Sequence, residues 1–320
     1  MSKHRVVAVD LGGTNIRAAL CGDDGLICKR TRRPTCPEQG FEAVIARLVE
    51  SVQAVLPGPA EGEAIAVGVA SPGPLDPYTG TVLYAANLRW SDVPLRDLLN
   101  QRLGLPVCVG NDANLAALGE QRYGAGRGVR DLAYVTISTG IGAGVILDDR
   151  LILGHRGMAT EVGHMVMDCD GPLDPAGVPG SLEGYAAGPA IARIAQEQLA
   201  AGRPSLMGEL VGSNIGALTA REVVEAAERG DPLAREVIAR VARIIGLGLV
   251  NLLHLFDPAL IVIGGSVGLA SDFLLDVARE TIQRHAMPPY RGVPLVRAHL
   301  GDDGGLLGAA ALAWQHAGRG

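Results

Sequence analysis

The chain has 320 residues, a length that favours two domains. Its formal net charge of −6 and its lack of a Lys/Arg block argue against a nucleic-acid partner. Hydrophobic residues make up 48% of the sequence and aromatic residues only 3%, so aliphatic side chains must build the cores. The five cysteines form no C-x-x-C pair, which favours reduced thiols in a cytoplasmic protein.

The sequence predicts neither a secretory signal nor a membrane anchor. The amino terminus enters a β-rich run by Arg5, without the apolar region of a signal peptide. The most apolar stretch, residues 244–256, is short for a membrane span and contains Asn251 and His254. We therefore expect a cytoplasmic protein with no membrane partner.

Residues 6–20, VVAVDLGGTNIRAAL, predict a strand, a glycine turn and a second strand. We expect Gly12 and Gly13 to supply the positive φ that a tight hairpin turn needs. A glycine turn also exposes backbone N–H groups to an anion. From these residues alone, an ordinary hairpin at a sheet edge is an equal alternative.

The chain then alternates between helical and extended patterns, which predicts a largely parallel sheet. Helices are expected at 41–56, 94–103 and 113–123, and strands at 63–70 and 106–109. Ligands collect at the carboxyl ends of parallel strands. We expect Asn111 and Asp112 in a loop at such an end.

Two later stretches repeat the pattern of a strand followed by a glycine turn. The first reads AYVTISTGIGAGVI and turns at Thr139 and Gly140. The second reads LIVIGGSVG and turns at Gly264 and Gly265. The three turns together predict one phosphate site assembled from distant parts of the chain. Neither a Walker loop nor a G-x-G-x-x-G dinucleotide fingerprint is present, so those two classes are disfavoured.

The second half of the chain contains further helical patterns and one long irregular stretch. Thr219 and Glu222 form a capping box ahead of an amphipathic helix. Helices are also expected at 232–256 and 304–315. Residues 154–188, rich in Gly, Pro and Asp, predict a loop.

Nine short motifs follow one another along nearly the whole chain: DLGGTN (10–15), ASPGPLD (70–76), NLRW (87–90), NDAN (111–114), STGIGAG (138–144), EVGH (161–164), SLE (181–183), IGGSV (263–267) and LGAAALA (307–313). This ordered set resembles the ROK family of bacterial sugar kinases, and its glucokinases in particular. The resemblance implies a duplicated actin/hexokinase-like (ribonuclease H-like) two-lobed α/β fold. It further implies an N-terminal lobe of residues 1–118 plus 302–320 and a C-terminal lobe of residues 119–301, with the sugar and ATP cleft between them.

The resemblance also implies roles for individual residues. Asp10 would hold Mg²⁺ through water, and Asp112 would be the general base that takes the proton of the sugar hydroxyl. The nucleotide would bind through its phosphates to Gly12, Gly13, Thr14, Asn15, Thr139 and Gly140, and through its adenosine to Gly264 and Gly265. The sugar hydroxyls would bind to Asn87, Asn111, Asp112, Glu161, His164 and Glu183.

Each of these residues also has a structural interpretation. Asp112 could cap the helix that follows it. Glu161 and His164 could be a polar pair on a helix surface, and Asn87 could be a turn residue. For Glu183 the residues themselves give no argument beyond the resemblance.

One loop departs from the family's pattern. Most ROK proteins follow the Gly-His pair with C-x-C-G-x-x-G-C, whose three thiolates join the histidine around a structural zinc. The aligned positions here are Asp174, Ala176 and Ser181, so no structural zinc is expected. A carboxylate or backbone carbonyl from residues 168–183, with Asp174 the first candidate, is expected to accept a hydrogen bond from His164 instead.

The expected reaction is the ATP-dependent phosphorylation of a hexose, with glucose and glucose 6-phosphate as the first candidates for substrate and product. N-acetylmannosamine, N-acetylglucosamine, fructose and mannose are alternative acceptors, and polyphosphate is an alternative donor. The family also contains sugar-sensing repressors that carry a winged helix-turn-helix ahead of the DLGGT motif. Only nine residues precede Asp10, which favours the kinase over such a non-catalytic regulator. The expected partners are a hexose, ATP and a second copy of the chain in a homodimer.

Overall fold

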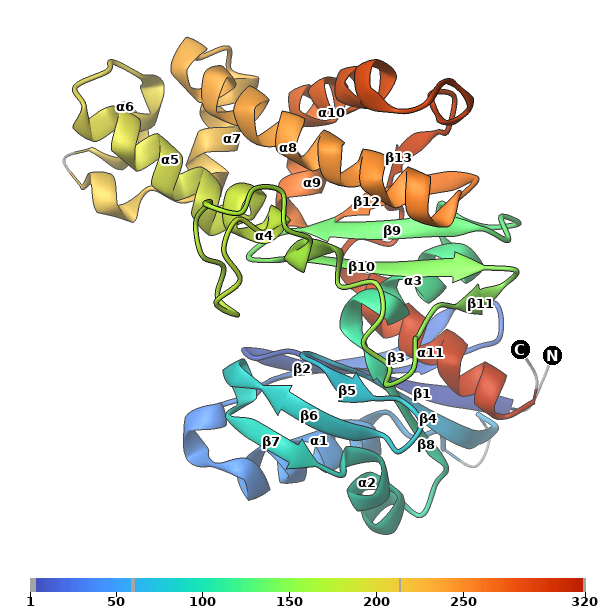
Figure 1. The fold of residues 1–320 in the computed structure, drawn as a ribbon. Coiled ribbons are helices and arrows are strands. Elements are labelled where there is room, and N and C mark those ends of the chain that lie inside the picture. The colour runs from blue at the N-terminus through green and yellow to red at the C-terminus, as the bar shows by residue number, and fades with distance from the viewer. Residues whose placement is uncertain (1–3, 59–60, 213, 319–320) are drawn as a thin grey trace. The chain divides into compact units, whose positions relative to one another are not determined.

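The computed structural model describes residues 4–58, 61–212 and 214–318 (Figure 1). The chain forms two compact units. The first unit comprises Met1–Arg130, Gly144–Thr160 and His299–Gly320, and the second comprises Asp131–Ala143 and Glu161–Ala298. Helices and strands alternate along the chain, so the predicted α/β class is confirmed.

The first unit is built on a five-stranded sheet with the order β3-β2-β1-β4-β8. Its strands are β1 (His4–Leu11), β2 (Asn15–Cys21), β3 (Ile27–Pro34), β4 (Glu63–Ser71) and β8 (Val107–Asn111). Strand β1 runs parallel to β4, and β4 runs parallel to β8. The parallel arrangement predicted for strands that alternate with helices is confirmed for β1, β4 and β8, and the antiparallel pair of β1 and β2 is the hairpin predicted for residues 6–20. Strand β3 also joins as an antiparallel neighbour, beside β2.

The second five-stranded sheet has the order β11-β10-β9-β12-β13. Its strands are β9 (Leu132–Ile137), β10 (Ile141–Leu147), β11 (Arg150–Leu151), β12 (Leu260–Gly264) and β13 (Leu295–Arg297). In both sheets the first strand of the set lies in the centre, the next two lie on one side of it, and the last two lie on the other. The same strand order thus occurs twice in the chain, as the prediction of a duplicated fold implies.

The remaining elements surround these sheets. The first unit adds α1 (Phe41–Val55), α2 (Leu95–Leu103), α3 (Asp112–Tyr123), α11 (Gly304–His316) and a small sheet of β5 (Leu75–Asp76), β6 (Thr81–Ala85) and β7 (Trp90–Val93). The second adds α4 (Leu182–Ala186), α5 (Gly188–Ala200), α6 (Leu206–Val211), α7 (Ala220–Glu228), α8 (Pro232–Phe256), α9 (Ser266–Ala270) and α10 (Asp272–His285). Single 3₁₀ turns occur at η1 (Pro37–Gln39), η2 (Ala86–Leu88), η3 (Val162–His164), η4 (Ile215–Ala217), η5 (Pro288–Tyr290) and η6 (Gly301–Asp303). The helices predicted from periodicity agree with the structure within one residue at each end.

Helices α1 and α11 cover opposite faces of the first sheet. Val67 and Val69 of β4 belong to the same hydrophobic cluster as Ile45 of α1. The residue between them, Gly68, faces α11, since a Cβ there would lie 1.9 Å from the carbonyl oxygen of Ala309. Alternate residues of a strand point to opposite faces, so the small residue is on the α11 side. The absence of a side chain allows α11 to pack closely on the sheet (Figure 1).

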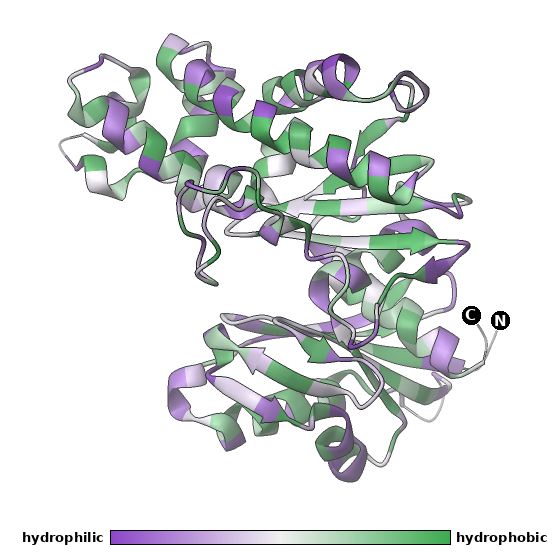
Figure 2. Ribbon diagram, viewed as in Figure 1, coloured by the Kyte–Doolittle hydropathy of each residue, from purple (hydrophilic) through white to green (hydrophobic). Residues whose placement is uncertain are grey.

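Helix α8 is the long apolar helix of the second unit. It has 25 residues and contains an 18-residue window with a mean hydropathy of 1.6, which meets the length and composition of a membrane span. The shorter apolar run in the sequence did not indicate this. However, 67% of the apolar window is buried inside the protein, and hydrophilic residues interrupt the hydrophobic ones along the helix (Figure 2). One face of α8 therefore packs in the hydrophobic core of the second unit. The capping box of Thr219 and Glu222 ahead of α7 is confirmed.

Helices α3 and α11 touch through backbone rather than through long side chains. A Cβ at Gly308 would lie 1.7 Å from the carbonyl oxygen of Leu115, and a Cβ at Gly119 would lie 2.5 Å from that of Gly304. Neither carbonyl oxygen can move aside without a shift of its helix. The two helices thus depend on glycine at their contact.

We predict that Gly308→Ala lowers the free energy of unfolding by about 1–3 kcal/mol, the usual range for overpacking. The control is Gly304→Ala in the same helix, where a Cβ would meet only the Cβ of Ala116, at 3.7 Å. Urea unfolding of the two variants measures the difference. Equal midpoints would contradict the packing described for this helix pair.

Candidate active site

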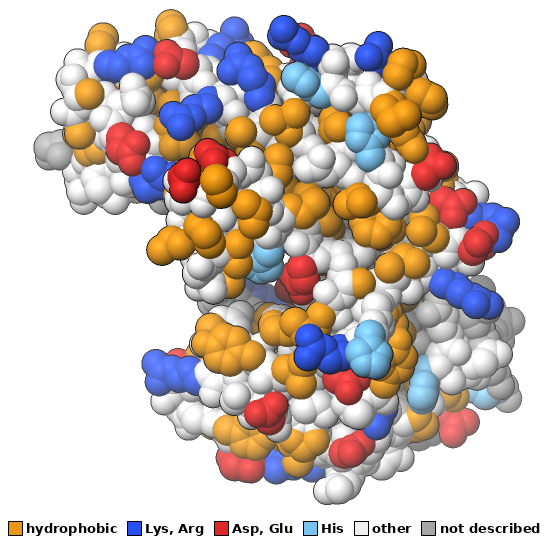
Figure 3. Space-filling model, in the orientation of Figure 1, with side chains coloured by type: hydrophobic (Ala, Val, Ile, Leu, Met, Phe, Trp, Pro, Cys, Tyr) orange, Lys and Arg blue, Asp and Glu red, His pale blue; other side chains and the backbone are white. Residues whose placement is uncertain are grey.

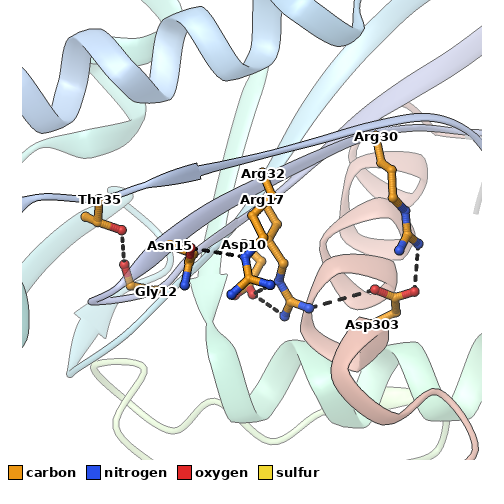
Figure 4. Close-up of polar contacts among 8 residues, drawn as sticks. All are labelled: Asp10, Gly12, Asn15, Arg17, Arg30, Arg32, Thr35 and Asp303. Carbon is orange, nitrogen blue, oxygen red and sulfur yellow. Dashed lines mark hydrogen bonds and ion pairs between the residues drawn. The ribbon is translucent and has the colours of Figure 1, made fainter.

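In the turn after β1, the carbonyl oxygens of Gly12 and Thr14 are hydrogen-bonded, whereas the amides of Gly13 and Thr14 have no acceptor among the described residues. The Gly12 N–H donates to the Asn15 carbonyl over 2.9 Å. The buried Thr35 donates from its hydroxyl to the Gly12 carbonyl (2.6 Å) and from its N–H to the Thr14 carbonyl (2.8 Å) (Figure 4). Within the described residues, the N–H groups of Gly13 and Thr14 have no acceptor. Outward amides with no competing carbonyl oxygen suit an anion.

The prediction of positive φ at Gly12 and Gly13 is wrong. Strand β1 ends at Leu11 and β2 begins at Asn15, so the turn is longer than the two-residue hairpin that demands positive φ. Space explains the glycines instead. A Cβ at Gly13 would lie 2.9 Å from the side-chain nitrogen of Asn87, in η2. The structure therefore places Asn87 directly against the turn.

Asp10 is the carboxylate that precedes this turn, and Arg17 holds it in place. Asp10 is opposite Arg17 in the strand register, and Arg17 is opposite Arg32, so all three share one face of the sheet. Arg17 donates from Nε over 2.9 Å and also from Nη2, both to Oδ2 of Asp10 (Figure 4). In the described part of the chain, Oδ1 of Asp10 has no hydrogen bond. A metal-bound water could therefore bind there without displacing Arg17.

The same face carries further charges that the sequence analysis missed. Asp303, just before α11, pairs with Arg30 (2.8 Å) and approaches Arg17 (3.8 Å). Arg32 donates from Nε to the Asn15 side chain over 3.0 Å and has no carboxylate partner among the residues described. The period-2 pattern of β3 places Arg30 and Arg32 on one face, but only the register with β2 aligns them with Asp10. Arg32 therefore offers a cation beside the turn.

Asn111 and Asp112 lie at the edge of the sheet where β1, β4 and β8 end. Asp10, Ala70 and Gly110 are in register across these strands, so Asp10 and Gly110 are two strand spacings, about 10 Å, apart. The prediction of a loop is wrong here, because Asn111 ends β8 and Asp112 begins α3 directly. The strand passes into the helix without intervening residues.

Asn111, and not Asp112, caps this helix. Its Oδ1 accepts hydrogen bonds from the N–H groups of Ala113 (3.0 Å) and Asn114 (3.2 Å), and its Nδ2 donates to the Gly73 carbonyl (3.3 Å). Asp112 accepts from the Ala113 N–H over 2.8 Å, and its side chain is exposed. The fold thus uses the amide of Asn111 and presents the carboxylate of Asp112 to solvent.

In the second unit, the two later glycine turns meet. The hydroxyl oxygens of Ser138 and Ser266, one from each turn, are 3.0 Å apart. Both residues line a cavity of about 600 Å³, together with Thr139 and with apolar side chains such as Leu218 and Val267. The cavity therefore combines a polar edge with apolar walls.

Gly264 and Gly265 do not themselves line this cavity. A Cβ at Gly264 would lie 2.2 Å from the hydroxyl of Tyr134, and one at Gly265 would lie 2.4 Å from the carbonyl oxygen of Ile137. Gly265 also has φ of 80°, which L side chains rarely adopt. These glycines let β12 turn sharply into α9, which brings Ser266 to the cavity.

Glu161, His164 and Glu183 gather in the second unit. Desolvation raises the pKa of Glu161; His164 lowers it, and the negative charge of Glu183 raises it further. Glu183 accepts a hydrogen bond from the Ile141 N–H over 2.7 Å, and its Oε2 would lie 2.6 Å from a Cβ at Gly140. The acidic cluster and the glycine turn are therefore neighbours.

His164 is joined to Asp174, as the sequence analysis expects. The Nδ1 of His164 and the Oδ2 of Asp174 are 2.8 Å apart. The other oxygen of Asp174 accepts from the N–H groups of Ala176 and Val178, each over 2.9 Å. Burial acts to raise the pKa of Asp174, but hydrogen bonds from His164, Val178 and Ser181 outweigh it and hold that pKa below its ordinary value. The carboxylate is buried, ionised and fully bonded.

A structural zinc does not fit the four aligned positions. Zinc in such a site takes about four nitrogen or sulfur ligands in a tetrahedral array. Here Ala176 has no donor atom, and the Ser181 hydroxyl accepts from the Gly184 N–H over 3.1 Å. The carboxylate of Asp174 already accepts hydrogen bonds from His164, Ala176, Val178 and Ser181. Only the imidazole of His164 remains from the family's ligand set.

We predict that the protein needs no zinc. Elemental analysis of protein purified without added metal should give well under one zinc per chain. A zinc-selective chelator should leave the melting temperature unchanged, because Ala176 offers no donor atom and the Asp174 carboxylate is already hydrogen-bonded. Stoichiometric zinc that is lost in a His164→Ala variant would contradict this description of the loop.

The repeated sheet plan, with glycine turns at the ends of its strands, defines the duplicated actin/hexokinase-like fold. The ROK family model matches residues 6–316, so the chain belongs to the ROK family.

Related proteins include both enzymes and a regulator. The glucokinase of Thermotoga maritima is 37% identical over 314 residues, which cover 98% of each chain. A ROK family glucokinase from Streptomyces griseus, solved with glucose and AMPPNP, has a TM-score of 0.82 at 37% identity and covers 97% of this chain and 99% of its own. A ROK family transcriptional regulator, a homologue of the E. coli MLC protein, has a TM-score of 0.85 at 25% identity and covers 98% of this chain and 78% of its own. The fold serves both roles, so function has to be argued from the site.

Proposed function

We propose that the protein is an ATP-dependent hexose kinase that converts glucose and MgATP to glucose 6-phosphate and MgADP. The observation that carries the proposal is the exposed carboxylate of Asp112 at the carboxyl edge of the first sheet. The glucokinases among the relatives, which match the chain over nearly its full length, support glucose as the acceptor. Asn111 is the N-cap of α3, and Asp112, the first residue of that helix, is exposed to solvent.

Asp112 is the general base in this proposal. As a sugar hydroxyl attacks the γ-phosphorus of ATP, its proton passes to the Asp112 carboxylate. The spacing of about 10 Å between the strand positions of Asp10 and Gly110 leaves room for a phosphoryl group and a sugar hydroxyl between metal and base.

The phosphate groups of ATP are proposed to bind the glycine turns. The open amides of Gly13 and Thr14, with Asn15 and Gly12 in the same turn, suit a phosphate in the first unit. Thr139 and Gly140 would do the same in the second unit. Asp10 suits Mg²⁺ because this ion keeps most of its waters and needs only one or two carboxylates. Bound there, Mg²⁺ would neutralise charge on the phosphate oxygens.

We assign the adenosine to the second unit and the sugar hydroxyls to residues of both units. The cavity of about 600 Å³ has the size and the apolar walls of a small-molecule pocket, and we assign it to adenosine, with Gly264 and Gly265 forming the turn behind it. The sugar hydroxyls are assigned to Glu161, His164 and Glu183 here, and to Asn87 and Asn111 in the first unit. Carboxylate and amide groups in fixed positions suit the several O–H donors of a hexose.

The reaction further requires groups from both parts of the chain. We propose that residues 1–118 plus 302–320 act as one lobe, that residues 119–301 act as the other, and that sugar binding brings them together and excludes water. Small-angle scattering with saturating glucose should then give a smaller radius of gyration than without it. An unchanged radius would count against closure. We also propose a cytoplasmic location and a homodimer. Basic and acidic side chains are mixed on the face shown in Figure 3.

We predict that Asp112→Asn lowers kcat by about 10²–10⁴-fold, the usual contribution of general base catalysis. The KM for glucose should change much less, because the amide retains the shape of the carboxylate. Asp97→Asn is the matched control, since Asp97 is an exposed aspartate in the first turn of α2. A coupled assay measures both constants. A kcat within a few-fold of the unmodified protein would remove Asp112 from the mechanism.

The acceptor is tested with a panel of hexoses. Glucose, mannose, fructose, N-acetylglucosamine and N-acetylmannosamine are each assayed with ATP, and glucose is also assayed with polyphosphate. We predict the highest kcat/KM for glucose with ATP. A higher value for any other sugar or donor would replace glucose or ATP in the proposal.

A further inference from the structure

The hydrogen bond between His164 and Asp174 fixes which nitrogen of the imidazole carries a proton. An ionised carboxylate accepts hydrogen bonds and donates none. The lowered pKa of Asp174 keeps it ionised, so the proton of the shared bond belongs to Nδ1 of His164. In the neutral ring, Nε2 is then an acceptor with a free lone pair. Within the described residues Nε2 has no hydrogen-bond partner.

The two partners differ strongly in exposure. The side chain of Asp174 is 0% exposed, whereas that of His164 is 35% exposed. The Asp174 carboxylate is therefore closed to solvent, whereas a ligand can contact the imidazole of His164. Glu161 and Glu183 face the same region, as the pKa shift of Glu161 indicates.

The loop that carries Asp174 is held by its own backbone. The Asp174 N–H donates to the Val178 carbonyl (3.1 Å), and the Gly177 N–H donates back to the Asp174 carbonyl (3.0 Å). Bridges at Leu173 with Pro179 and at Val166 with Ser181 close the loop further out. At Gly180, with φ of 63°, a Cβ would lie 1.5 Å from the Asp168 carbonyl oxygen, so the crossing requires glycine.

We propose that Asp174 is a positioning residue that replaces the metal of other ROK proteins: it fixes the Nδ1–H tautomer of His164, so that Nε2 accepts a hydrogen bond from a sugar hydroxyl. The sugar-binding part of this proposal rests on the proposed function. The tautomer part does not, because it follows from the contacts of Asp174 alone. A metal bound at Nδ1 would have the same effect, since it too would leave Nε2 as the free acceptor.

The variant Asp174→Asn separates positioning from loop structure. The amide oxygen can still accept from Ala176 and Val178, which keeps the loop closed. Its NH₂ group then faces Nδ1 of His164 and must donate to it. The ring proton therefore moves to Nε2, which turns the sugar-facing nitrogen from acceptor to donor.

The control is Asp168→Asn in the same loop. Asp168 is exposed and accepts from the hydroxyl of Tyr185 (3.1 Å), with no hydrogen bond to His164. The Asp168→Asn variant removes one negative charge from the loop, as Asp174→Asn does. It should leave both the tautomer and the KM for glucose unchanged.

Nitrogen NMR of the histidine-labelled full chain is the direct readout. The chain has seven histidines, and a His164→Gln variant identifies the signals of His164. We expect a protonated Nδ1 in the unmodified protein and in Asp168→Asn, and a protonated Nε2 in Asp174→Asn. The melting temperature of Asp174→Asn reports separately on the loop.

Glucose kinetics test the second half of the proposal. We expect the KM for glucose to rise about tenfold or more in Asp174→Asn, with a much smaller change in kcat, since one polar contact to the sugar is mismatched. A protonated Nε2 in the unmodified protein would overturn the whole proposal. A switched tautomer with unchanged KM would overturn the sugar contact. If the unmodified protein phosphorylates no hexose while Nδ1 is protonated, the proposed function fails and the tautomer assignment stands.

Discussion

The proposed phosphate site of the first unit depends on which backbone N–H and C=O groups of the turn after β1 are hydrogen-bonded. Thr35 donates to the carbonyl oxygens of Gly12 and Thr14, and the Gly12 N–H donates to the carbonyl oxygen of Asn15. Backbone polar groups must be paired or solvated, so the unpaired amides can only face outward. An anion that binds there meets donors alone, and the fold needs no lysine of the Walker type. Asp10 and Arg17 then balance charge at the same edge.

At the proposed sugar site of the second unit, a carboxylate takes up the hydrogen bond of one imidazole nitrogen. An imidazole that binds a sugar must present one defined nitrogen, and a second group has to hold the other. In this chain the buried Asp174 takes that role and also closes its own loop through two backbone amides. A single side chain thus joins loop stability to the orientation of His164. If His164 binds the sugar as proposed, this coupling would keep the imidazole oriented in a loop that differs from the family's pattern.

The sequence predicts those features that depend on local pattern. The bounds of α8 follow from its helical period, with Asp231 as cap and Pro232 at its first position. The bond from His164 to Asp174 follows from alignment with the family. The roles of Arg17 and Arg32 could not be predicted, because they require the register of three strands. The prediction of a positive φ at Gly12 and Gly13 was wrong, because the turn between Leu11 and Asn15 is longer than a two-residue hairpin. The contact of Gly13 with Asn87 is tertiary and could not be read from the local pattern either.

The most direct test of the account is the identity of the products. The protein is incubated with glucose, ATP and Mg²⁺, and phosphorus NMR follows both substrates and products. We predict glucose 6-phosphate and ADP in equal amounts, because the proposed general base, Asp112, would take the proton of a sugar hydroxyl as that hydroxyl attacks the γ-phosphorus. ADP and inorganic phosphate without a sugar phosphate would contradict it, as would the absence of any turnover.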